Sequence, residues 1–423
     1  MTLPLRVPFG CLLALVLAVA CSPAPSSADP AHPFPQHLTY AAGTIAPNHR
    51  TQDQLDADVV AAYLSWKDRY LVRTPRVVDG IRLRRIAFGK PGTANHRRTV
   101  SEGQGYGLVI LAQMAGSDPR AQQYFNGVWK FTREHPSTID RRLMSWRTPG
   151  SSDSAFDGDA DMAYGLLLAD RQWGSDGVVD YRAAANRLLT GIEESTIGAR
   201  SRLPMLGDWV NPGGKRYNQF TPRTSDFMPA HFRAFARFTG KPVWDDVAAR
   251  ASRAVTQLQA LHPGTGLLPD FTVPADGPSD DLAPAPAYFL EGPDDGHYGY
   301  NAGRNPWRLG TDALLNGDPG SLAQTRRISR WARGATGGVP RRIRSGYRLN
   351  GRPSRGSDYF TTFFAAPLGV AAMTVPGEQE WLNDVYDAVR RRREDYYSDT
   401  VTLLCLLVMT RNYWDPTAPL ARP

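Results

Sequence analysis

Apolar residues recur with helical spacing in about a dozen segments of this 423-residue chain, and loops rich in glycine and proline separate them. Few stretches show the two-residue alternation of a half-buried strand. Taken in order, the segments form about six pairs, which predicts an all-α domain built from helix hairpins. The segments with helical spacing are 53–72, 101–115, 120–133, 159–172, 180–193, 227–238, 243–260, 307–314, 320–333, 358–374, 378–392 and 397–411.

We expect one catalytic domain over residues 41–415, because no stretch after about residue 40 has the composition of an interdomain linker. Two interior breaks, 198–226 and 262–306, are long for a compact domain. Loops of that length usually carry function, so binding or catalytic residues are expected within them.

The first 21 residues predict a signal peptide. Arg6 precedes an apolar run over 9–20 that is too short to span a bilayer. The run ends at Cys21 in a sequence that resembles a bacterial lipobox, with ordinary signal-peptidase cleavage nearby as the alternative. Residues 22–40, rich in serine, proline and alanine, predict a flexible tether. The chain is therefore expected to be secreted, or held by a lipid anchor on the outer face of the membrane.

Charge and composition exclude several classes of partner. Lysine and arginine outnumber the acids by 49 to 41, and the densest basic run, 390–393, is followed at once by two acids, as on a solvated helix. Nucleic acid is therefore not an expected partner. The eight histidines show no ligand spacing, so no metal is expected. The three cysteines, Cys11, Cys21 and Cys405, leave the mature chain without a plausible internal disulfide.

One carboxylate is expected at the N-terminus of an apolar helix. Residues 101–107 read SEGQGYG and run directly into a strongly apolar segment. Ser101 suits an N-cap, which places Glu102 in the first turn. Three alternating glycines weaken that helix by about 1 kcal/mol each relative to alanine, which favours close approach of a ligand to the backbone. The plainer alternative is a capped core helix with a solvated glutamate.

A second acidic group precedes another helix. Asp157, Asp159 and Asp161 alternate with small residues. A calcium loop is excluded because its sixth position requires glycine and is Met162, and its twelfth requires glutamate and is Leu168. Helix capping explains one or two of the three acids. The remaining aspartate is expected at the N-terminal end of its helix, on the same side of the domain as Glu102.

Aromatic, acidic and arginine side chains gather in the loop over 288–308. Aromatic and guanidinium faces stack on sugar rings, while carboxylates and amides bind hydroxyl groups. This composition predicts a carbohydrate-binding site, although single aromatic residues here can equally be core. The candidate stacking platforms are Trp146, Trp209, Tyr300, Tyr396 and Tyr397.

These segments together resemble glycoside hydrolase family 8. The resemblance rests on 101–107, on 155–163 with its following LLAD run, and on the arginines and tryptophan of 304–308, with weaker similarity at 264–270 and 396–397. It covers nearly the whole mature chain in order. It implies an (α/α)6 barrel with an open cleft across the helix ends. It also implies endo-cleavage of β-1,4-linked polysaccharides with inversion, without a cofactor.

The resemblance also implies roles for individual residues. Glu102 matches the general acid, and Asp157 matches the central aspartate that binds and distorts the sugar at the cleavage point. Trp146 and Arg304 match positions that line the cleft. Phe156 stands where family members often have serine or threonine.

The general base is where the chain departs from the cellulase branch of the family. That branch has an aspartate after a tyrosine, but here Asn301 follows Tyr300, and an amide cannot take a proton from water. A branch resembling chitosanases and mixed-linkage glucanases has this asparagine and uses a glutamate on an inserted loop. Glu291 lies where that insertion is expected, with Asp294 and Asp295 as the next candidates.

The sequence leaves the substrate and the class of protein open. Chitosan would need acids near its amines, and Asp226, Asp294 and Asp295 are available in sequence, while β-glucan is equally compatible. A polysaccharide lyase acting on an acidic polymer is the first alternative, since a basic protein suits a uronate chain. A non-catalytic glycan-binding lipoprotein is the second. A monomer acting on a polysaccharide is expected.

Overall fold

The computed structural model describes Met1 and residues 29–276 and 280–419. The predicted signal peptide and the lipobox cysteine Cys21 lie outside the described residues. Every segment predicted to be helical is a helix, with ends that differ by a few residues. The helices are α1 (Gln52–Tyr70), α2 (Ser101–Gln113), α3 (Ala121–Arg133), α4 (Phe156–Trp173), α5 (Tyr181–Thr196), α6 (Pro229–Thr239), α7 (Val243–Leu261), α8 (Asn305–Asn316), α9 (Pro319–Thr336), α10 (Thr362–Ala372), α11 (Gln379–Val389) and α12 (Tyr396–Met409).

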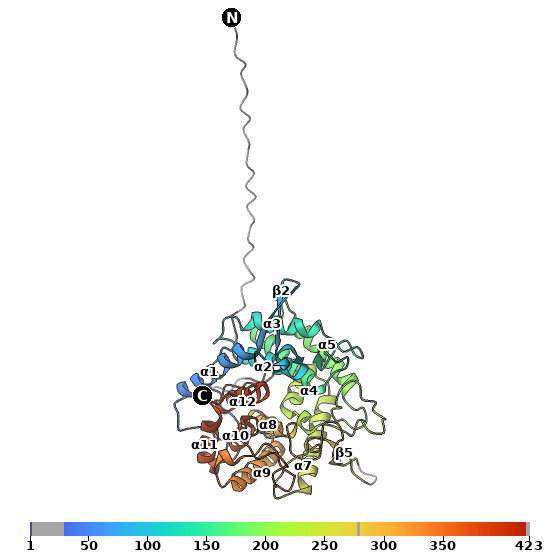
Figure 1. Cartoon of the computed structure of the whole chain (residues 1–423), viewed down its shortest axis with the longest axis vertical. Coiled ribbons are helices and arrows are strands. Elements are labelled where there is room, and N and C mark those ends of the chain that lie inside the picture. The colour runs from blue at the N-terminus through green and yellow to red at the C-terminus, as the bar shows by residue number, and fades with distance from the viewer. Residues whose placement is uncertain (2–28, 277–279, 420–423) are drawn as a thin grey trace.

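The even-numbered helices form a closed inner ring (Figure 1). Helix α2 packs on α4, and contacts continue through α6, α8 and α10 to α12, which packs back on α2. Each odd-numbered helix packs on the outside of one inner helix, α1 on α12, α3 on α2, α5 on α4, α7 on α6, α9 on α8 and α11 on α10. Two concentric rings of six helices are the predicted (α/α)6 barrel.

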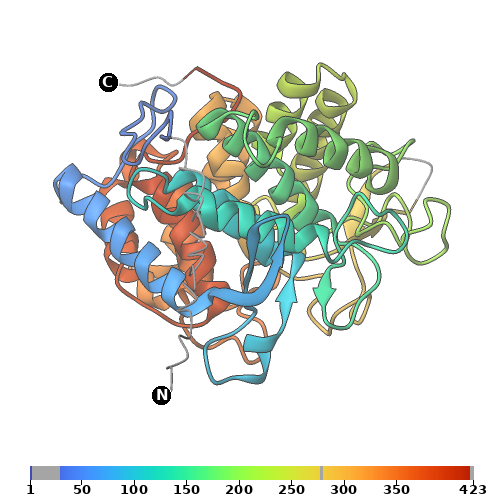
Figure 2. The ribbon, with the colours of Figure 1, turned by 90° about the horizontal axis from the view of Figure 1, so that it is seen from above.

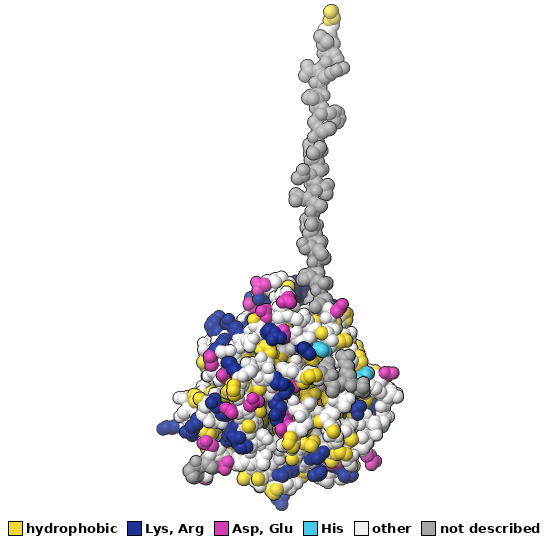
Figure 3. All heavy atoms as spheres, turned by 180° about the vertical axis from the view of Figure 1, so that it is seen from behind, with side chains coloured by type: hydrophobic (Ala, Val, Ile, Leu, Met, Phe, Trp, Pro, Cys, Tyr) yellow, Lys and Arg dark blue, Asp and Glu magenta, His cyan; other side chains and the backbone are white. Residues whose placement is uncertain are grey.

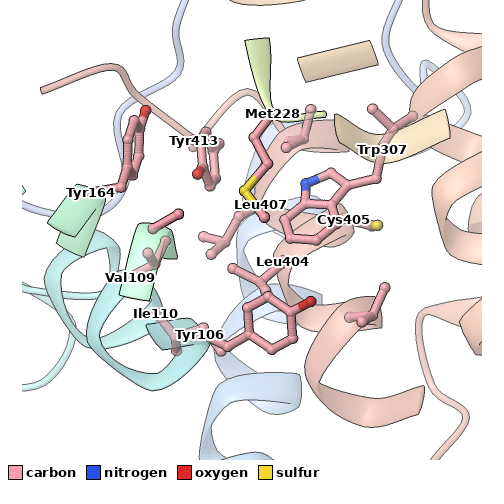
Figure 4. Close-up of a cluster of buried hydrophobic side chains, with 14 of the residues drawn as sticks. Tyr106, Val109, Ile110, Tyr164, Met228, Trp307, Leu404, Cys405, Leu407 and Tyr413 are labelled. Carbon is pink, nitrogen blue, oxygen red and sulfur yellow. The ribbon is translucent and has the colours of Figure 1, made fainter. Parts of the chain in front are cut away.

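Side chains from the inner ring fill the centre of the barrel (Figure 4). Tyr106 and Ile110 of α2, Trp307 of α8 and Leu404 of α12 converge there and are all buried. Cys405 lies in the same cluster as a buried free thiol. The inner helices are buried nearly all round, whereas outer helices such as α9 bury one face, which is the pattern expected for two concentric layers.

The glycines of α2 serve helix packing, which corrects the expectation that they make room for a ligand. A Cβ atom on Gly105 would lie 2.6 Å from Cβ of Asp161 and 2.8 Å from the carbonyl oxygen of Gly158, both on α4. A Cβ atom on Gly107 would lie 2.5 Å from Ile86. The absence of a side chain lets α2 approach α4 closely at Gly105 and the end of the Ile81–Ile86 strand at Gly107.

The predicted N-cap of α2 is also wrong. Val100 is the N-cap, and Ser101 is the first helical residue. The backbone N–H of Ser101 donates to the carbonyl oxygen of Trp146 at 2.8 Å, because the short strand that precedes it pairs with the strand after Trp146. This pairing fixes the direction in which α2 begins.

Within the described residues, the strands occur in three antiparallel pairs. They are β1 (Leu71–Val78) with β2 (Ile81–Ile86), β3 (Thr99–Val100) with β4 (Arg147–Thr148), and β5 (Thr272–Pro274) with β6 (Leu282–Pro284). Strands β2, β3 and β4 lie side by side (Figure 2). The first hairpin was not predicted, although Asp79 and Gly80, both with positive φ, form a strong two-residue turn signal.

The flexible tether predicted over 22–40 does not extend to residue 40. The backbone N–H of Ala31 donates to Gln172, that of Phe34 to Ala115 and that of Leu38 to Arg411. Phe34 and Leu38 are buried against the body, which explains why this segment is ordered. Among the described residues, no helix has the length and apolar character that crossing a membrane requires.

Candidate active site

The site is assembled where the inner helices begin. Glu102 lies in the first turn of α2 and Asp157 in the first turn of α4. Arg304 ends the short 3-10 helix that leads into α8. Because the inner helices run in the same direction around the ring, residues more than 200 positions apart in sequence meet at one end of the barrel.

Glu102 is a mostly buried carboxyl whose Oε2 accepts a hydrogen bond from Nη1 of Arg304 at 2.8 Å. Its side chain is 16% exposed. Burial raises the pKa of Glu102 to about 7; the Arg304 guanidinium opposes this rise, and the Asp157 carboxylate adds to it. A large fraction of Glu102 is therefore protonated at neutral pH.

Asp157 has the opposite ionisation. Its Oδ2 accepts from Nη1 of Arg304 at 2.9 Å and from Nη1 of Arg223 at 3.2 Å. Burial acts to raise the pKa of Asp157, but the two guanidinium groups outweigh it and hold the pKa below its usual value. Asp157 is therefore an anion at the centre of the site.

Glu291 lies on the loop between β6 and α8, and its side chain is 52% exposed. Its Oε2 accepts a hydrogen bond from Nδ2 of Asn301 at 2.9 Å, and its Oε1 lies 3.6 Å from Nη2 of Arg223. Among the loop carboxylates predicted as candidate bases, it is the one joined directly to Asn301.

The two reserve candidates are engaged elsewhere. Asp295 is buried and accepts from the backbone N–H groups of Leu290, Glu291 and Gly292, so it holds the loop that carries Glu291. Asp294 lies 2.9 Å from Nδ1 of His297. Asp295 therefore supports the loop, whereas Asp294 contacts His297.

Asn301 and Arg304 connect the two glutamates. Nη2 of Arg304 donates to Oδ1 of Asn301 at 3.1 Å, and the amide nitrogen of Asn301 donates to Glu291. The backbone N–H groups of this turn are anchored on Oδ1 of Asp270, which accepts from Asn301 at 3.1 Å. The result is a continuous chain of hydrogen bonds from Glu102 through Arg304 and Asn301 to Glu291.

Arg223 is a functional candidate that the sequence did not reveal. Its guanidinium lies between Asp157 and Glu291, and Nη1 is also 3.9 Å from Asp226. It follows a long loop without periodicity, so no pattern marked it; its one signal is the acid three residues later.

Asp226 was predicted to contact substrate, and its burial contradicts this. Its side chain is fully buried, with no hydrogen-bond partner for either oxygen in the described structure. Burial raises its pKa to about 7, and the nearby Arg223 opposes the rise. Asp226 lies beneath Arg223 and is not at the surface of the site.

The predicted aromatic platforms differ in accessibility. Trp146 and Tyr300 are 38% and 40% exposed, and Trp209 and Tyr397 are partly buried. Tyr397 donates its hydroxyl to the backbone of Tyr300 at 3.2 Å and lies beside Arg304. Tyr396 is buried at 2% exposure, so its prediction as a stacking platform is wrong; its ring packs against Tyr70 and Phe88.

A helix turns 100° per residue, so Asp159 lies on the side of α4 opposite to Asp157, whereas Asp161 lies one turn further along the same side. Asp157, in the first turn, is the one whose carboxylate contacts Arg223 and Arg304. Asp159 accepts from the backbone N–H of Met144 at 3.0 Å, and Asp161 forms a buried ion pair with Arg308. In the part of the chain that the structure describes, no three metal-ligating side chains cluster.

Two acidic groups of contrasting ionisation near exposed aromatic rings are the arrangement expected of a glycan-cleaving hydrolase. The chain belongs to the glycosyl hydrolases family 8, whose model matches residues 56–411. It is a glycoside hydrolase, which removes the polysaccharide lyase alternative.

Similar proteins support the same assignment. A β-glucanase of Niallia circulans is 38% identical over 414 residues, which cover 96% of both chains. An endoglucanase of Bacillus sp. strain KSM-330 is 36% identical over 91% of this chain and 82% of that protein. The apo structure of a β-1,3-1,4-glucanase from Paenibacillus sp. X4 has a TM-score of 0.85 at 37% identity, covering 93% of this chain and all of that one (100%).

Proposed function

We propose that this chain is an inverting endo-β-glucanase in which Glu102 is the general acid and Glu291 the general base. The observation that carries the proposal is the contrast between two carboxyls at the ends of one hydrogen-bonded chain. Glu102 is mostly buried with a pKa near 7, while Glu291 is half exposed and accepts from Asn301.

The reaction requires one proton to be delivered and another to be removed. Glu102 donates its proton to the glycosidic oxygen as the bond from that oxygen to the anomeric carbon breaks. A water molecule attacks the anomeric carbon from the opposite face, and Glu291 accepts the proton that this water loses. One water is consumed, and the new reducing end has inverted configuration.

Arg304 and Asp157 assist this step electrostatically. Arg304 already donates to Glu102 at 2.8 Å, so it stabilises the carboxylate that remains after proton transfer. Asp157, held as an anion by two guanidinium groups, provides negative charge where the sugar ring becomes positive. Its oxygens also suit hydroxyl groups of the bound sugar.

The arrangement is compatible with inversion. Inverting enzymes keep their carboxyls roughly 6.5–9.5 Å apart to admit a water, whereas retaining enzymes bring them to about 5–5.5 Å. Here two side chains, Arg304 and Asn301, intervene between Glu102 and Glu291. The two carboxyls therefore share no direct contact, and the configuration of the released reducing end decides between the two mechanisms.

A neutral β-glucan suits the site better than chitosan. Of the three acids considered for amine binding, Asp226 is fully buried, Asp295 is saturated by backbone N–H groups, and Asp294 pairs with His297. Two arginines, Arg223 and Arg304, stand at the centre. The similar proteins named as β-glucanase and endoglucanase point to the same substrate class.

Reducing-end release on barley β-glucan, carboxymethylcellulose, chitosan and xylan tests the proposal, with Glu102→Gln run beside the unmodified protein. We expect activity on barley β-glucan that the substitution abolishes. Activity that survives in Glu102→Gln would place the acid elsewhere, and activity on chitosan alone would overturn the substrate assignment. No activity on any polymer would favour a glycan-binding role.

We further propose that the chain is exported and carries a lipid on Cys21. The sequence of the first 21 residues supports this. Cell fractionation with labelled fatty acid tests it: the label is expected in the membrane fraction and lost in Cys21→Ala. A protein found unlabelled in the medium would indicate simple secretion.

A further inference from the structure

A second part of the chain is strongly basic and is not used by the proposed reaction. Residues 319–357, which form α9 and the segment after it, contain ten arginines and neither lysine, histidine, aspartate nor glutamate. The face that Figure 3 shows carries both basic and acidic side chains. The arginines are Arg326, Arg327, Arg330, Arg333, Arg341, Arg342, Arg344, Arg348, Arg352 and Arg355.

Most of this charge is not neutralised within the protein. Arg344 pairs with Asp358 at 2.8 Å, and none of the other nine forms an ion pair with a carboxylate in the described residues. Glu378 interacts electrostatically with Arg330 and Arg333, but it is buried and bonded to Ser329. Some other arginines of this protein, such as Arg142, do form ion pairs with acidic side chains.

Three of these arginines line one hollow of about 590 Å³ together with Trp331. Two of them are held by backbone oxygens, which orient a guanidinium without cancelling its charge. Nε of Arg326 donates to the carbonyl oxygen of Thr374 at 2.6 Å, and Nη1 of Arg327 contacts that of Gln259 at 3.5 Å. The hollow therefore presents oriented positive groups beside an aromatic ring.

The hollow adjoins the segment that carries the active-site asparagine. Trp331 packs edge-on against Tyr347, with ring centroids 4.9 Å apart. The backbones of Tyr347 and Tyr298 exchange two hydrogen bonds of 2.9 Å, and Asn301 follows three residues after Tyr298. The hollow is thus linked through Trp331 and Tyr347 to the segment that leads to Asn301.

We propose that this hollow binds a carboxylate-bearing polysaccharide, such as a polyuronate, at a site separate from catalysis. Planar guanidinium groups match carboxylates with two parallel hydrogen bonds, and the Trp331 ring suits a sugar face. The hollow is concave and contains an aromatic ring, which suits a sugar ring of a polymer. The site would hold the enzyme on an acidic matrix in which neutral glucan is embedded.

Binding of the mature chain to polygalacturonate tests this proposal, with Arg327→Gln/Arg330→Gln as the test variant. The matched control is Arg97→Gln/Arg391→Gln, which removes the same charge from two exposed arginines without ion pairs in the described structure. We expect saturable binding that weakens at least about tenfold in the test variant, since a charge-assisted hydrogen bond to a carboxylate contributes that much. The control should stay close to the unmodified protein, and Trp331→Ala should weaken binding while Trp331→Phe restores it.

Hydrolysis of barley β-glucan should be unchanged in both double variants, which shows that they fold and separates this site from the proposed catalytic one. Equal weakening in the control, or no binding by the unmodified protein, would overturn the proposal. So would equally tight binding to phosphatidylglycerol vesicles or single-stranded DNA with the same loss in the test variant. Those results would show that these arginines bind polyanions in general.

Discussion

Glu102 and Glu291 stand at the two ends of one hydrogen-bonded chain, but different structures hold them. Glu102 belongs to a helix packed between buried neighbours, and burial raises its pKa to about 7. Glu291 belongs to a loop held by Asp295, and half of its side chain reaches solvent. The same chemical group thus becomes a proton donor in one place and a candidate acceptor in the other through its environment.

Glu102 and Glu291 also differ in how rigidly they are held. The close contact of α2 with α4 leaves Glu102 little freedom, whereas the Glu291 loop depends on a few hydrogen bonds. An acid must meet a fixed glycosidic oxygen, while a base must leave room for water.

Glu102→Gln should have the largest effect. The amide cannot donate the proton, so kcat on barley β-glucan is expected to fall about 10²–10⁴-fold. An aryl β-glucoside with a good leaving group needs little acid assistance, and its hydrolysis should fall much less. Steady-state kinetics on both substrates measure this; equal losses on the two would contradict the assignment of Glu102 as the acid.

Asn301→Asp should impair the action of Glu291 as the general base. The new carboxylate would lie where Nδ2 now donates to Glu291 at 2.9 Å, and two like charges at that distance oppose each other's ionisation. We expect kcat/KM to fall at least about tenfold, since a shift of one pKa unit corresponds to that factor. Asp294→Asn, on the same loop but outside the chain, is the control and should change activity little.

Gly105→Ala should test how tightly the acid side is packed. Its Cβ would lie 2.6 Å from Asp161, so the free energy of unfolding is expected to fall by about 1–3 kcal/mol. Gly334→Ala in α9, where a Cβ meets nothing within 4 Å, should instead stabilise the protein by about 0.4–1 kcal/mol. Urea unfolding measures both; equal effects would show that α2 and α4 are not closely packed.

Activity should fall as pH rises through about 7, because Glu102 must be protonated to act. The pH profile of kcat/KM on barley β-glucan measures this alkaline limb. A limb that lies well above pH 7 would contradict the pKa of Glu102.

Stability should change in the same direction and by a smaller amount. Burial raises the pKa values of Glu102, Asp226 and Asp270 to about 7, above their values in the unfolded chain. The folded state therefore binds more protons, and its stabilisation is complete below pH 4 and is lost as pH rises through about 7. Thermal unfolding between pH 5 and 8 measures this, and Asp226→Asn should reduce the change.

The sequence predicted the helices well because each inner and outer helix carries its own apolar periodicity. The β1–β2 hairpin was missed because its alternation is weak: its strands are mostly half buried, with only Leu83 and Ile86 fully so. The positions of functional residues in loops were still harder to predict from the sequence. Arg223 has no periodic context, and the burial of Asp226 and Tyr396 depends on segments that meet only in the folded chain.

Glu102, Asp157, Asn301 and Arg304 were placed by motifs, and the structure brings them together with Glu291. The choice among Glu291, Asp294 and Asp295 could not be made from sequence, because three acids within five positions differ only in what they contact. Their catalytic roles stay predictions.

Addition of azide to Glu291→Ala tests the central claim most directly, since a small anion can replace the water that the missing base no longer activates. On barley β-glucan we predict that azide restores cleavage and that the product is the α-glycosyl azide, as attack opposite the leaving group requires. Failure of azide to rescue Glu291→Ala, together with rescue of Asp294→Ala, would contradict the assignment. A β-glycosyl azide would contradict inversion itself.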